Sequence, residues 1–259
     1  MAGFLFSDMV FGPVNSRRLG VSLGINLLPT DYKFCTFNCV YCECGWTKSG
    51  DGNKFPLPST GELREKLEAK MKDLADQGIL PDAITFAGNG EPTLHPEFPD
   101  IMDMVITLRD KYFPDARITV LSNASQVHKE KIFMALRKAD QNILKLDAGT
   151  DETFRKINQP KGNLTIRDVV DSLKKFEGKL IIQTLFMEGT INGQKVSNTG
   201  QEEIGKWIEH LREINPEYVM IYAIDRETPA ENIRKLSFRE LNEIADKVEL
   251  AGFRTKVFG

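Results

Sequence analysis

Cysteine is scarce in this chain and confined to one short stretch. The sequence has four cysteines in 259 residues, and none follows Cys44. Four thiols within ten residues are too few and too close together for a disulfide-stapled fold. They are also too few for two separate cysteine-held metal centres. A single site that uses these thiols is what remains.

Basic charge and long apolar runs are also missing. The formal net charge is −3 and the pI about 5.8, which does not resemble the basic footprint of a general nucleic-acid binder and leaves only a local basic patch open. No apolar run is long enough to cross a membrane. Residues 1–13 lack the basic start of a signal peptide and are interrupted by Asp8 and Pro13. We therefore expect a cytoplasmic protein with no membrane partner, in which clustered cysteines indicate metal or redox chemistry.

The remaining composition is that of an ordinary globular protein. The chain is 41% apolar and 27% charged, which is enough to bury one sizeable core. Its length is compatible with one α/β barrel. We expect a single domain over residues 1–259.

Three of the cysteines have the spacing of a metal-binding loop. Cys35, Cys39 and Cys42 form a C-x3-C-x2-C pattern, and soft thiolates this close together can converge on one soft metal centre. An iron–sulfur cubane normally takes four protein ligands, so three would leave one iron open. A tetrahedral zinc ion would take Cys44 as its fourth ligand. The spacing alone leaves both possibilities open.

The sequence alternates between strand and helix patterns. Apolar runs bounded by turn residues predict strands, and apolar residues spaced i, i+3, i+4, i+7 predict helices. The expected strands are 21–28, 82–87, 117–125, 143–147, 179–189 and 218–225, with a final short strand at 255–258. The expected helices are 63–77, 101–108, 128–138, 164–176, 204–211 and 238–251. About six βα units result, and the cysteine loop directly follows the first strand, as a (β/α) barrel requires.

A glycine-rich segment follows the second predicted strand. Residues 88–92 read GNGEP. Glycines at a strand exit allow the backbone to approach a ligand closely, and free carbonyls beside a carboxylate suit an ammonium group. Taken alone, this segment is equally compatible with a tight turn.

The cysteine motif resembles the signature of the radical S-adenosylmethionine (radical SAM) superfamily, with Tyr41 as the aromatic residue before the last cysteine. The resemblance implies that Cys35, Cys39 and Cys42 hold one [4Fe–4S] cluster, whose fourth iron is chelated by SAM. It places Tyr41 near the adenine of SAM. It also implies reductive cleavage of SAM to a 5′-deoxyadenosyl radical, which abstracts hydrogen from a substrate. Cys44 is outside the pattern and is interpreted as a bystander thiol.

Two further segments extend the resemblance. GNGEP is similar to the Gly-Gly-Glu segment with which this superfamily recognises the amino group of SAM. Asn89 replaces one glycine, whereas Gly90 and Glu91 match. Residues 11–24 resemble the opening of the iron–sulfur oxidoreductases related to wyosine synthases. The implied fold is a partial (β/α)6 TIM-like barrel. A structural zinc site would explain neither GNGEP nor Tyr41, and it stays as a remote alternative.

Other candidate residues lie at later strand ends. Ser122 and Asn123 are expected to hydrogen-bond the ribose or carboxylate of SAM, or else to start a turn. Lys145 and Asp147 are two residues apart on one strand face, and we expect ligand contact in preference to a structural ion pair. Two further features stay open: Arg17 and Arg18 are equally compatible with an anion site and a surface pair, and residues 190–198 with a substrate lid and a solvated loop. The three histidines are interpreted as structural or exposed.

We expect a radical SAM oxidoreductase with an unidentified substrate and no assigned catalytic residue. The substrate classes left open are a small molecule, an RNA base, and a glycine in a partner protein, as for a glycyl-radical-enzyme activase. The chain has no visible flavin motif or second-cluster motif. The electron is therefore expected from an external low-potential donor, a flavodoxin or a ferredoxin.

Overall fold

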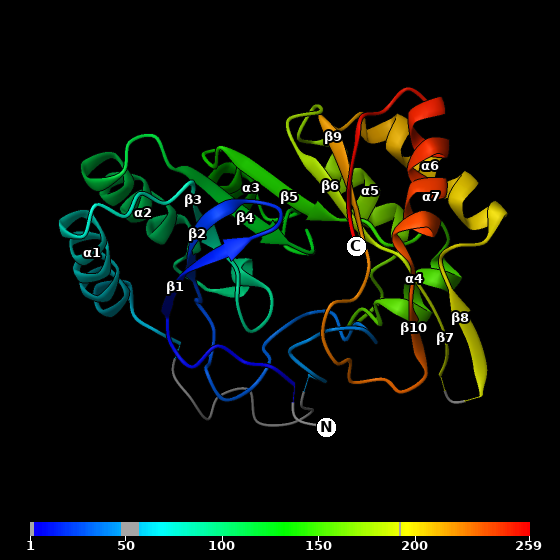
Figure 1. Ribbon diagram of the computed structural model, residues 1–259, viewed down its shortest axis with the longest axis horizontal. Coiled ribbons are helices and arrows are strands. Elements are labelled where there is room, and N and C mark those ends of the chain that lie inside the picture. The colour runs from blue at the N-terminus through cyan, green and yellow to red at the C-terminus, as the bar shows by residue number, and fades with distance from the viewer. Residues whose placement is uncertain (1–2, 48–56, 192) are drawn as a thin grey trace.

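A curled eight-stranded sheet forms the centre of the protein (Figure 1). The computed structural model describes residues 3–47, 57–191 and 193–259. Within this sheet, every strand other than β1 runs parallel to its neighbours, and β1 pairs antiparallel with β2 at one edge. In spatial order the strands are β1 (Val10–Ser16), β2 (Gly20–Ile25), β3 (Ala83–Phe86), β4 (Arg117–Ser122), β5 (Gln141–Lys145), β6 (Ile181–Leu185), β9 (Tyr218–Tyr222) and β11 (Thr255–Phe258).

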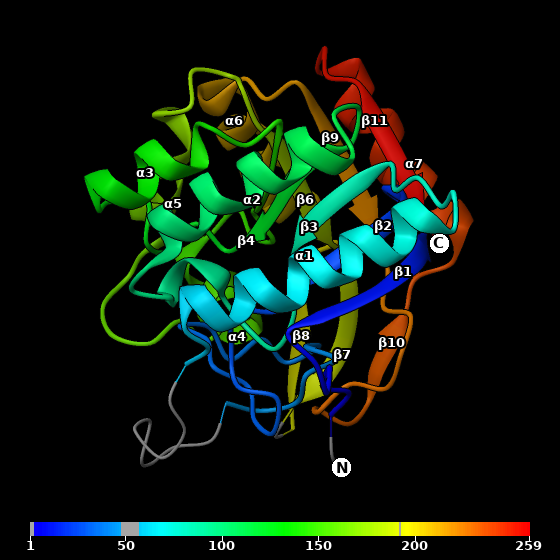
Figure 2. The ribbon, with the colours of Figure 1, turned by 90° about the vertical axis from the view of Figure 1, so that its left-hand side faces the viewer.

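Helices cover the outer face of this sheet. Figures 1 and 2 show α1, α2 and α3 over the strands of the N-terminal half, and α5, α6 and α7 over those of the C-terminal half. The helices are α1 (Thr60–Asp76), α2 (Phe98–Tyr112), α3 (Glu130–Leu136), α4 (Asp151–Ile157), α5 (Ile166–Lys174), α6 (Gln201–Ile214) and α7 (Phe238–Leu250), with a short 3-10 turn η1 (Pro92–Leu94). The result is the partial TIM-like barrel that the sequence predicts.

The apolar periodicity explains which helix face is buried. In α1 the residues Leu63, Leu67, Met71 and Leu74 are buried at helical spacing. Strands β3 and β6 are buried at every position. Continuous burial is expected for parallel strands that are covered on both faces. At the start of α7, Ser237 and Glu240 form a reciprocal cap, as their Ser-x-x-Glu spacing favours.

The six predicted βα strands and the final strand are present, but β1 was not predicted. Its sequence, VFGPVNS, contains Gly12 and Pro13, which disfavour a strand interior. The pairing register between β1 and β2 shifts between Phe11 and Val14. Proline is tolerated there because β1 is an edge strand with one unpaired side.

Residues 187–191 and 194–197 form two paired strands, so the expectation of a loop at 190–198 was wrong. Strands β7 (Met187–Ile191) and β8 (Gln194–Ser197) pair antiparallel, and β10 (Ile233–Lys235) pairs with β7. The Asn-Gly pair at 192–193 predicts a turn, and Asn192 lies outside the described residues. The hairpin is anchored by Asn198, whose side chain accepts from Met187 N at 2.9 Å and donates to Leu185 O at 2.7 Å and Asp147 O at 2.9 Å.

Residues 199–202, Thr-Gly-Gln-Glu, have the pattern of a capping box, but helix α6 begins differently. Its N-cap is Gly200, which makes no side-chain capping bond. Glu203 instead accepts from the amides of Gly149 (2.5 Å) and Thr150 (3.2 Å). This carboxylate therefore ties α6 to the connection that follows β5.

None of the helices in the described part of the chain combines the length and apolarity needed to span a membrane. The polar stretch at 46–58 contains glycine and proline and predicts a loop, and most of it lies outside the described residues. The expectation of one domain over 1–259 stays a prediction.

Two leucines test whether the buried face of α1 stabilises the sheet. Leu67 is fully buried, whereas Leu80 is 73% exposed. We expect Leu67→Ala to lower the free energy of unfolding by about 2–5 kcal/mol, because it removes buried methyl groups and leaves a cavity. The matched control, Leu80→Ala, should change it by less than about 0.5 kcal/mol. Urea unfolding followed by circular dichroism measures both, and equal losses would contradict the assigned packing.

Candidate active site

The cysteine loop is held against the glycine-rich segment by backbone pairing. Phe34, directly before Cys35, donates its amide to Asn89 O at 2.8 Å and accepts from Glu91 N at 3.1 Å. A Cβ atom at Gly90 would lie 1.8 Å from the carbonyl oxygen of Phe34. Glycine is therefore required here because two protein backbones meet, whatever ligand contact is added. The two motifs that the sequence singled out are brought together by this bridge.

A second attachment holds the middle of the loop. Asn38 and Val40 donate their amides to Asn158 O (3.0 Å) and Ile157 O (2.9 Å), at the end of α4. Phe37 is almost fully buried and packs edge-on against Phe154, with ring centroids 5.4 Å apart. The loop is thus fixed at both sides of the second cysteine.

The four thiols line one cavity of about 160 Å³. Cys39 is buried, and Cys35, Cys42 and Cys44 are half-buried. Other residues around the same space are Lys33, Tyr41, Gly88, Gly90, Glu91, Leu121, Ser122, Asn123, Lys145 and Gln183. Every site residue predicted from the sequence therefore lines this cavity, except Asn89 and Asp147.

Amide groups are directed at the sulfur atoms of two of the predicted ligands. Cys35 Sγ lies 3.4 Å from Phe37 N and 3.5 Å from Asn123 Nδ2, and Cys39 Sγ lies 3.4 Å from Asn158 Nδ2. N–H groups that point at sulfur stabilise thiolate charge and tune iron–sulfur centres.

A buried lysine supplies positive charge beside the thiols. Lys33 is 2% exposed, and its ammonium donates to Gly45 O at 3.2 Å. Burial alone would lower the pKa of Lys33, but the nearby thiolates, above all that of Cys42, hold it above its ordinary value. Burial raises the pKa of Cys35 to about 12, against the opposing charge of Lys33. A hydrogen bond from Cys44 and the charge of Lys33 outweigh burial and lower the pKa of Cys42.

This donor set fits a soft, thiolate-bound centre that carries negative charge. One space is surrounded by three soft thiols, by amide groups that donate to two of the sulfur atoms, and by a buried ammonium group. Within residues 3–47, 57–191 and 193–259, no three His, Cys, Asp or Glu side chains are gathered closely enough to hold one metal ion. The fit therefore rests on donor chemistry and on the shared cavity.

Glu91, predicted to receive the amino group of SAM, is already saturated by protein donors. Its Oε1 accepts from the Thr93 amide (3.1 Å) and hydroxyl (2.5 Å) and from the Ser122 hydroxyl (2.8 Å). Its Oε2 accepts from the amide of Asn123 at 2.7 Å. Burial raises the pKa of this carboxyl, against the effect of these bonds. Glu91 therefore joins the exits of β3 and β4.

Asn89 is fully buried and also structural in its contacts. Its amide accepts from Phe6 N at 2.9 Å and donates to Phe6 O (2.9 Å) and Pro29 O (2.8 Å). Its backbone amide donates to Asn26 Oδ1 at 3.1 Å. The side chain that departs from the Gly-Gly-Glu pattern thus fastens the N-terminal segment to the site.

Ser122 and Asn123 complete the wall formed by β4. Besides its bond to Glu91, the Ser122 hydroxyl accepts from the amide of Ala124 at 3.0 Å. Asn123 donates to Thr36 Oγ1 at 3.0 Å and accepts from Ser125 N at 2.9 Å. These bonds include the turn that the sequence offered as the alternative to cofactor contact.

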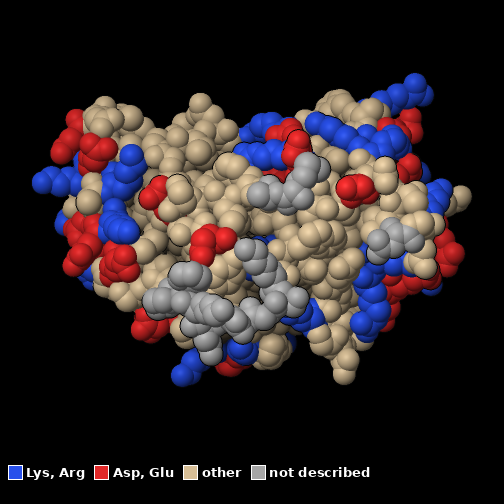
Figure 3. All heavy atoms as spheres, turned by 90° about the horizontal axis from the view of Figure 1, so that it is seen from below, with Lys and Arg blue, Asp and Glu red and all other residues tan. Residues whose placement is uncertain are grey.

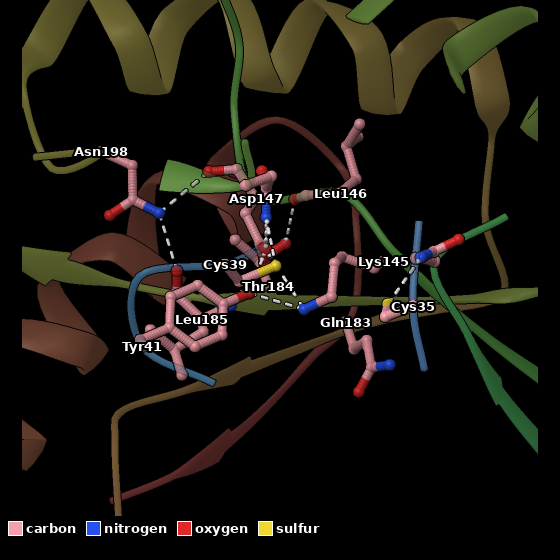
Figure 4. Close-up of polar contacts among 12 residues, drawn as sticks. Cys35, Cys39, Tyr41, Lys145, Leu146, Asp147, Gln183, Thr184, Leu185 and Asn198 are labelled. Atoms are coloured by element: carbon pink, nitrogen blue, oxygen red, sulfur yellow. Dashed lines mark hydrogen bonds and ion pairs between the residues drawn. The ribbon is translucent and has the colours of Figure 1, made fainter. Parts of the chain in front are cut away.

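Lys145 and Asp147 form a buried ion pair that includes Tyr41 (Figure 4). Lys145 Nζ lies 3.2 Å from Asp147 Oδ2 and 2.5 Å from the Tyr41 hydroxyl, which itself donates to Asp147. Asn158 Nδ2 (2.6 Å) and Leu185 N (3.0 Å) also donate to the carboxylate. The two side chains meet, but Asp147 is engaged by four protein groups and does not line the cysteine cavity.

Sequence reasoning missed Lys33 and Asn158. Lys33 carries a local signal, since it is the basic residue two positions before the first cysteine. Asn158 carries none, because it reaches Cys39 from 119 positions away. Of the histidines, His95 is buried and bonds Pro58 O at 2.8 Å, His128 is exposed, and His210 bonds Gly149 O at 2.9 Å. None of the three lines the cysteine cavity.

The comparisons with known proteins agree with this geometry. A family model described as "Radical SAM superfamily" matches residues 30–232. The chain is 32% identical over 244 residues to a Brachyspira hyodysenteriae protein named GTPase Obg, covering 92% of this chain and 33% of that protein. It is 32% identical over 212 residues to a UPF0026 protein of Methanocaldococcus jannaschii, covering 80% and 61%. The chain therefore spans less than two thirds of the length of either relative.

Solved structures show the same fold at low sequence identity. A radical SAM methyltransferase from Sphaerobacter thermophilus superimposes with a TM-score of 0.67 at 16% identity, over 92% of this chain and 65% of that one. Archaeal TYW1 gives a TM-score of 0.54 at 14% identity, over 89% and 72%. At these identities the likeness concerns the fold alone.

The buried ion pair gives a test of the site's internal electrostatics. Burial alone would lower the pKa of Lys145, but the charge of Asp147 holds it above its ordinary value. In Asp147→Asn the buried ammonium loses its counter-charge, and we expect unfolding to become easier by about 3 kcal/mol at pH 7. The pKa of Lys145 then falls below that of the unfolded chain. Stability of the variant should therefore rise with pH up to about 10.

Urea unfolding at pH 7 and at higher pH, relative to the unsubstituted protein, measures both effects. The matched control is Lys145→Met combined with Asp147→Asn, which removes both charges and should recover most of the loss. A double variant no more stable than Asp147→Asn would contradict the pairing.

Proposed function

The chain belongs to the radical SAM superfamily, and we propose that it binds one [4Fe–4S] cluster through Cys35, Cys39 and Cys42 to cleave SAM reductively. Membership of this superfamily implies an enzyme of radical chemistry. One observation carries the finer proposal: the three motif thiols line the same cavity as the glycine-rich segment, and the Phe34–Gly90 bridge fixes the two together.

When bound, such a cluster and SAM supply a 5′-deoxyadenosyl radical for hydrogen abstraction. The residues of this chain prepare the space for that chemistry. Lys33 offsets thiolate charge, while the amides of Phe37, Asn123 and Asn158 donate to sulfur. Phe37 and Val40 are buried on the loop itself and keep water from its inner side.

We assign the amino-acid end of SAM to the backbone around Gly90. The side chains of Asn89 and Glu91 already have protein partners, so they position this backbone. Tyr41 lines the cavity with its ring while Asp147 holds its hydroxyl, which suits the adenine contact proposed for it. Ser122, Asn123, Lys145 and Asp147 are proposed to shape the SAM site through the bonds described above.

The reductant and the substrate are assigned by class. The part of the chain that the structure describes has no further cysteine cluster, which supports an external low-potential donor such as a flavodoxin or ferredoxin. The substrate classes are a small molecule, an RNA base, or a glycine of a partner protein. If the substrate is an RNA base, the purified protein should carry bound RNA, and its affinity for RNA should fall steeply as the salt concentration rises. If the substrate is a glycine of a partner protein, the two proteins should form a stable complex, and the partner should carry a detectable radical.

The test is reconstitution without oxygen, followed by measurement of iron and of 5′-deoxyadenosine formed from SAM. We expect about four irons per chain and slow 5′-deoxyadenosine release after reduction. Cys39→Ala should lose both, because it removes a ligand. Iron content and the electron paramagnetic resonance signal of the reduced protein give readouts independent of turnover.

Cys44→Ala is the matched control in the same loop. It should keep its iron, because Cys44 lies outside the three-cysteine motif. Loss of metal in both variants, with one zinc per chain and intact SAM in the unsubstituted protein, would refute the proposal. That result would establish a structural four-cysteine zinc site instead.

A further inference from the structure

A second cavity of about 510 Å³ adjoins the cysteine loop. Both cavities are lined by Tyr41, Cys42, Gly88, Gly90 and Gln183, so they form one continuous space. The larger one extends to the turn between β1 and β2. Its volume is within the range of small-molecule sites.

Arg18 lies at the far end of this space. It comes from the β1–β2 turn, and its NH1 donates to Gln183 Oε1, in the middle of β6, at 3.0 Å. Its guanidinium carbon lies 4.9 Å from the centre of the Tyr222 ring, at the end of β9. These two contacts orient the guanidinium and use one of its five N–H donors. Gln183 extends away from the Tyr41–Asp147 cluster (Figure 4).

Among the basic residues around this cavity, Arg18 has no carboxylate as an ion-pair partner in the described part of the chain. Arg17 pairs with Asp225 and Arg226 with Glu43, each at 2.9 Å. Lys145, at the boundary with the cysteine cavity, pairs with Asp147. Within the described residues no Asp or Glu pairs with Arg18. A guanidinium stays protonated in proteins, so a half-buried positive charge faces the cavity with donors unused. The unused N–H donors suit an oxyanion.

We propose that Arg18 binds an oxyanion of the substrate, a carboxylate or a phosphate, and that the substrate is therefore a small anionic molecule. The fork of N–H groups matches either oxyanion in two-point contact. The Tyr222 hydroxyl has no protein partner in the described part of the chain and is available beside it. The substrate class rests on the proposed function, whereas the anion site itself does not.

SAM is not the anion that this geometry favours. The carboxylate of SAM belongs at the cluster end of the space, and Arg18 does not line the cysteine cavity. A nucleic acid is also disfavoured, because the neighbouring arginines Arg17 and Arg226 are neutralised by acidic residues. On the face that Figure 3 shows, outside the residues drawn in grey, Lys and Arg lie in separate groups with Asp and Glu among them.

The test measures anion binding by isothermal titration calorimetry on the reconstituted protein and on the protein before iron loading. The probes are inorganic phosphate and succinate, titrated at constant ionic strength set by chloride. We expect saturable binding of at least one of them, and the tighter of the two identifies the class. Arg18→Met should weaken it by about tenfold or more, and Arg18→Lys less, since it keeps the charge but loses the fork.

Arg17→Met is the matched control, because the neighbouring arginine is already paired with Asp225. It should bind the anion within about twofold of the unsubstituted protein. Circular dichroism checks that each variant is folded. If Arg18→Met does not fold, Arg18→Lys provides the test instead.

Three results would overturn the proposal: no saturable binding of either anion, equal losses in Arg17→Met and Arg18→Met, or an equal loss of SAM affinity in Arg18→Met. Co-purified RNA whose binding needs Arg18 and weakens steeply with salt would assign the site to a polyanion instead. Anion binding that depends on Arg18 in a protein that neither takes up iron nor cleaves SAM would leave the site in place. In that case the proposed radical chemistry alone would fail.

Discussion

The backbone pairing between Phe34 and Gly90 is the constraint on which the site depends. A loop that leaves β2 and a segment that leaves β3 exchange two hydrogen bonds at the point where Cys35 begins. Because parallel strands place their carboxyl ends at one edge, the two loops meet without a long connection. Any side chain at position 90 would collide with the Phe34 carbonyl. Motifs that are more than forty residues apart in sequence therefore face one cavity.

Two buried carboxylates hold the walls of that cavity. Glu91 joins the ends of β3 and β4 through four donors, and Asp147 joins the end of β5 to the cysteine loop and β6. Each is stabilised by neighbouring donors, without which a buried charge is expensive. The site is thus preorganised by polar groups that face inward to the protein, while the thiols, the Gly90 backbone and Arg18 face the space that a cofactor and substrate share. One set of groups therefore shapes the cavity, and another set is free to bind a cofactor or a substrate.

The order of strands and helices was readable from sequence because periodicity and turn residues act locally. Leu63, Leu67, Met71 and Leu74 mark the buried face of α1 without knowledge of any partner. The edge strand β1 and the β7–β8 hairpin were not readable, because their residues are stabilised by distant groups. Pro13 argues against a strand unless the strand is known to lie at an edge. Residues 194–197 need Asn198 and its bonds to Asp147 and Leu185 to become part of a sheet.

The sequence by itself determined that three soft thiols lie close together, because their type and spacing are contained within eight residues of one loop. It also determined that strands and helices alternate, which places that loop at the end of a barrel strand. Only the tertiary structure decided which polar residues are free to meet a ligand. In the described part of the chain the side chains of Glu91, Asn89 and Asp147 already have protein partners, whereas Arg18 keeps unused N–H donors. The physical reason is that hydrogen-bond satisfaction is settled by partners up to 165 positions away, as for Arg18 and Gln183, and no local pattern records those distances.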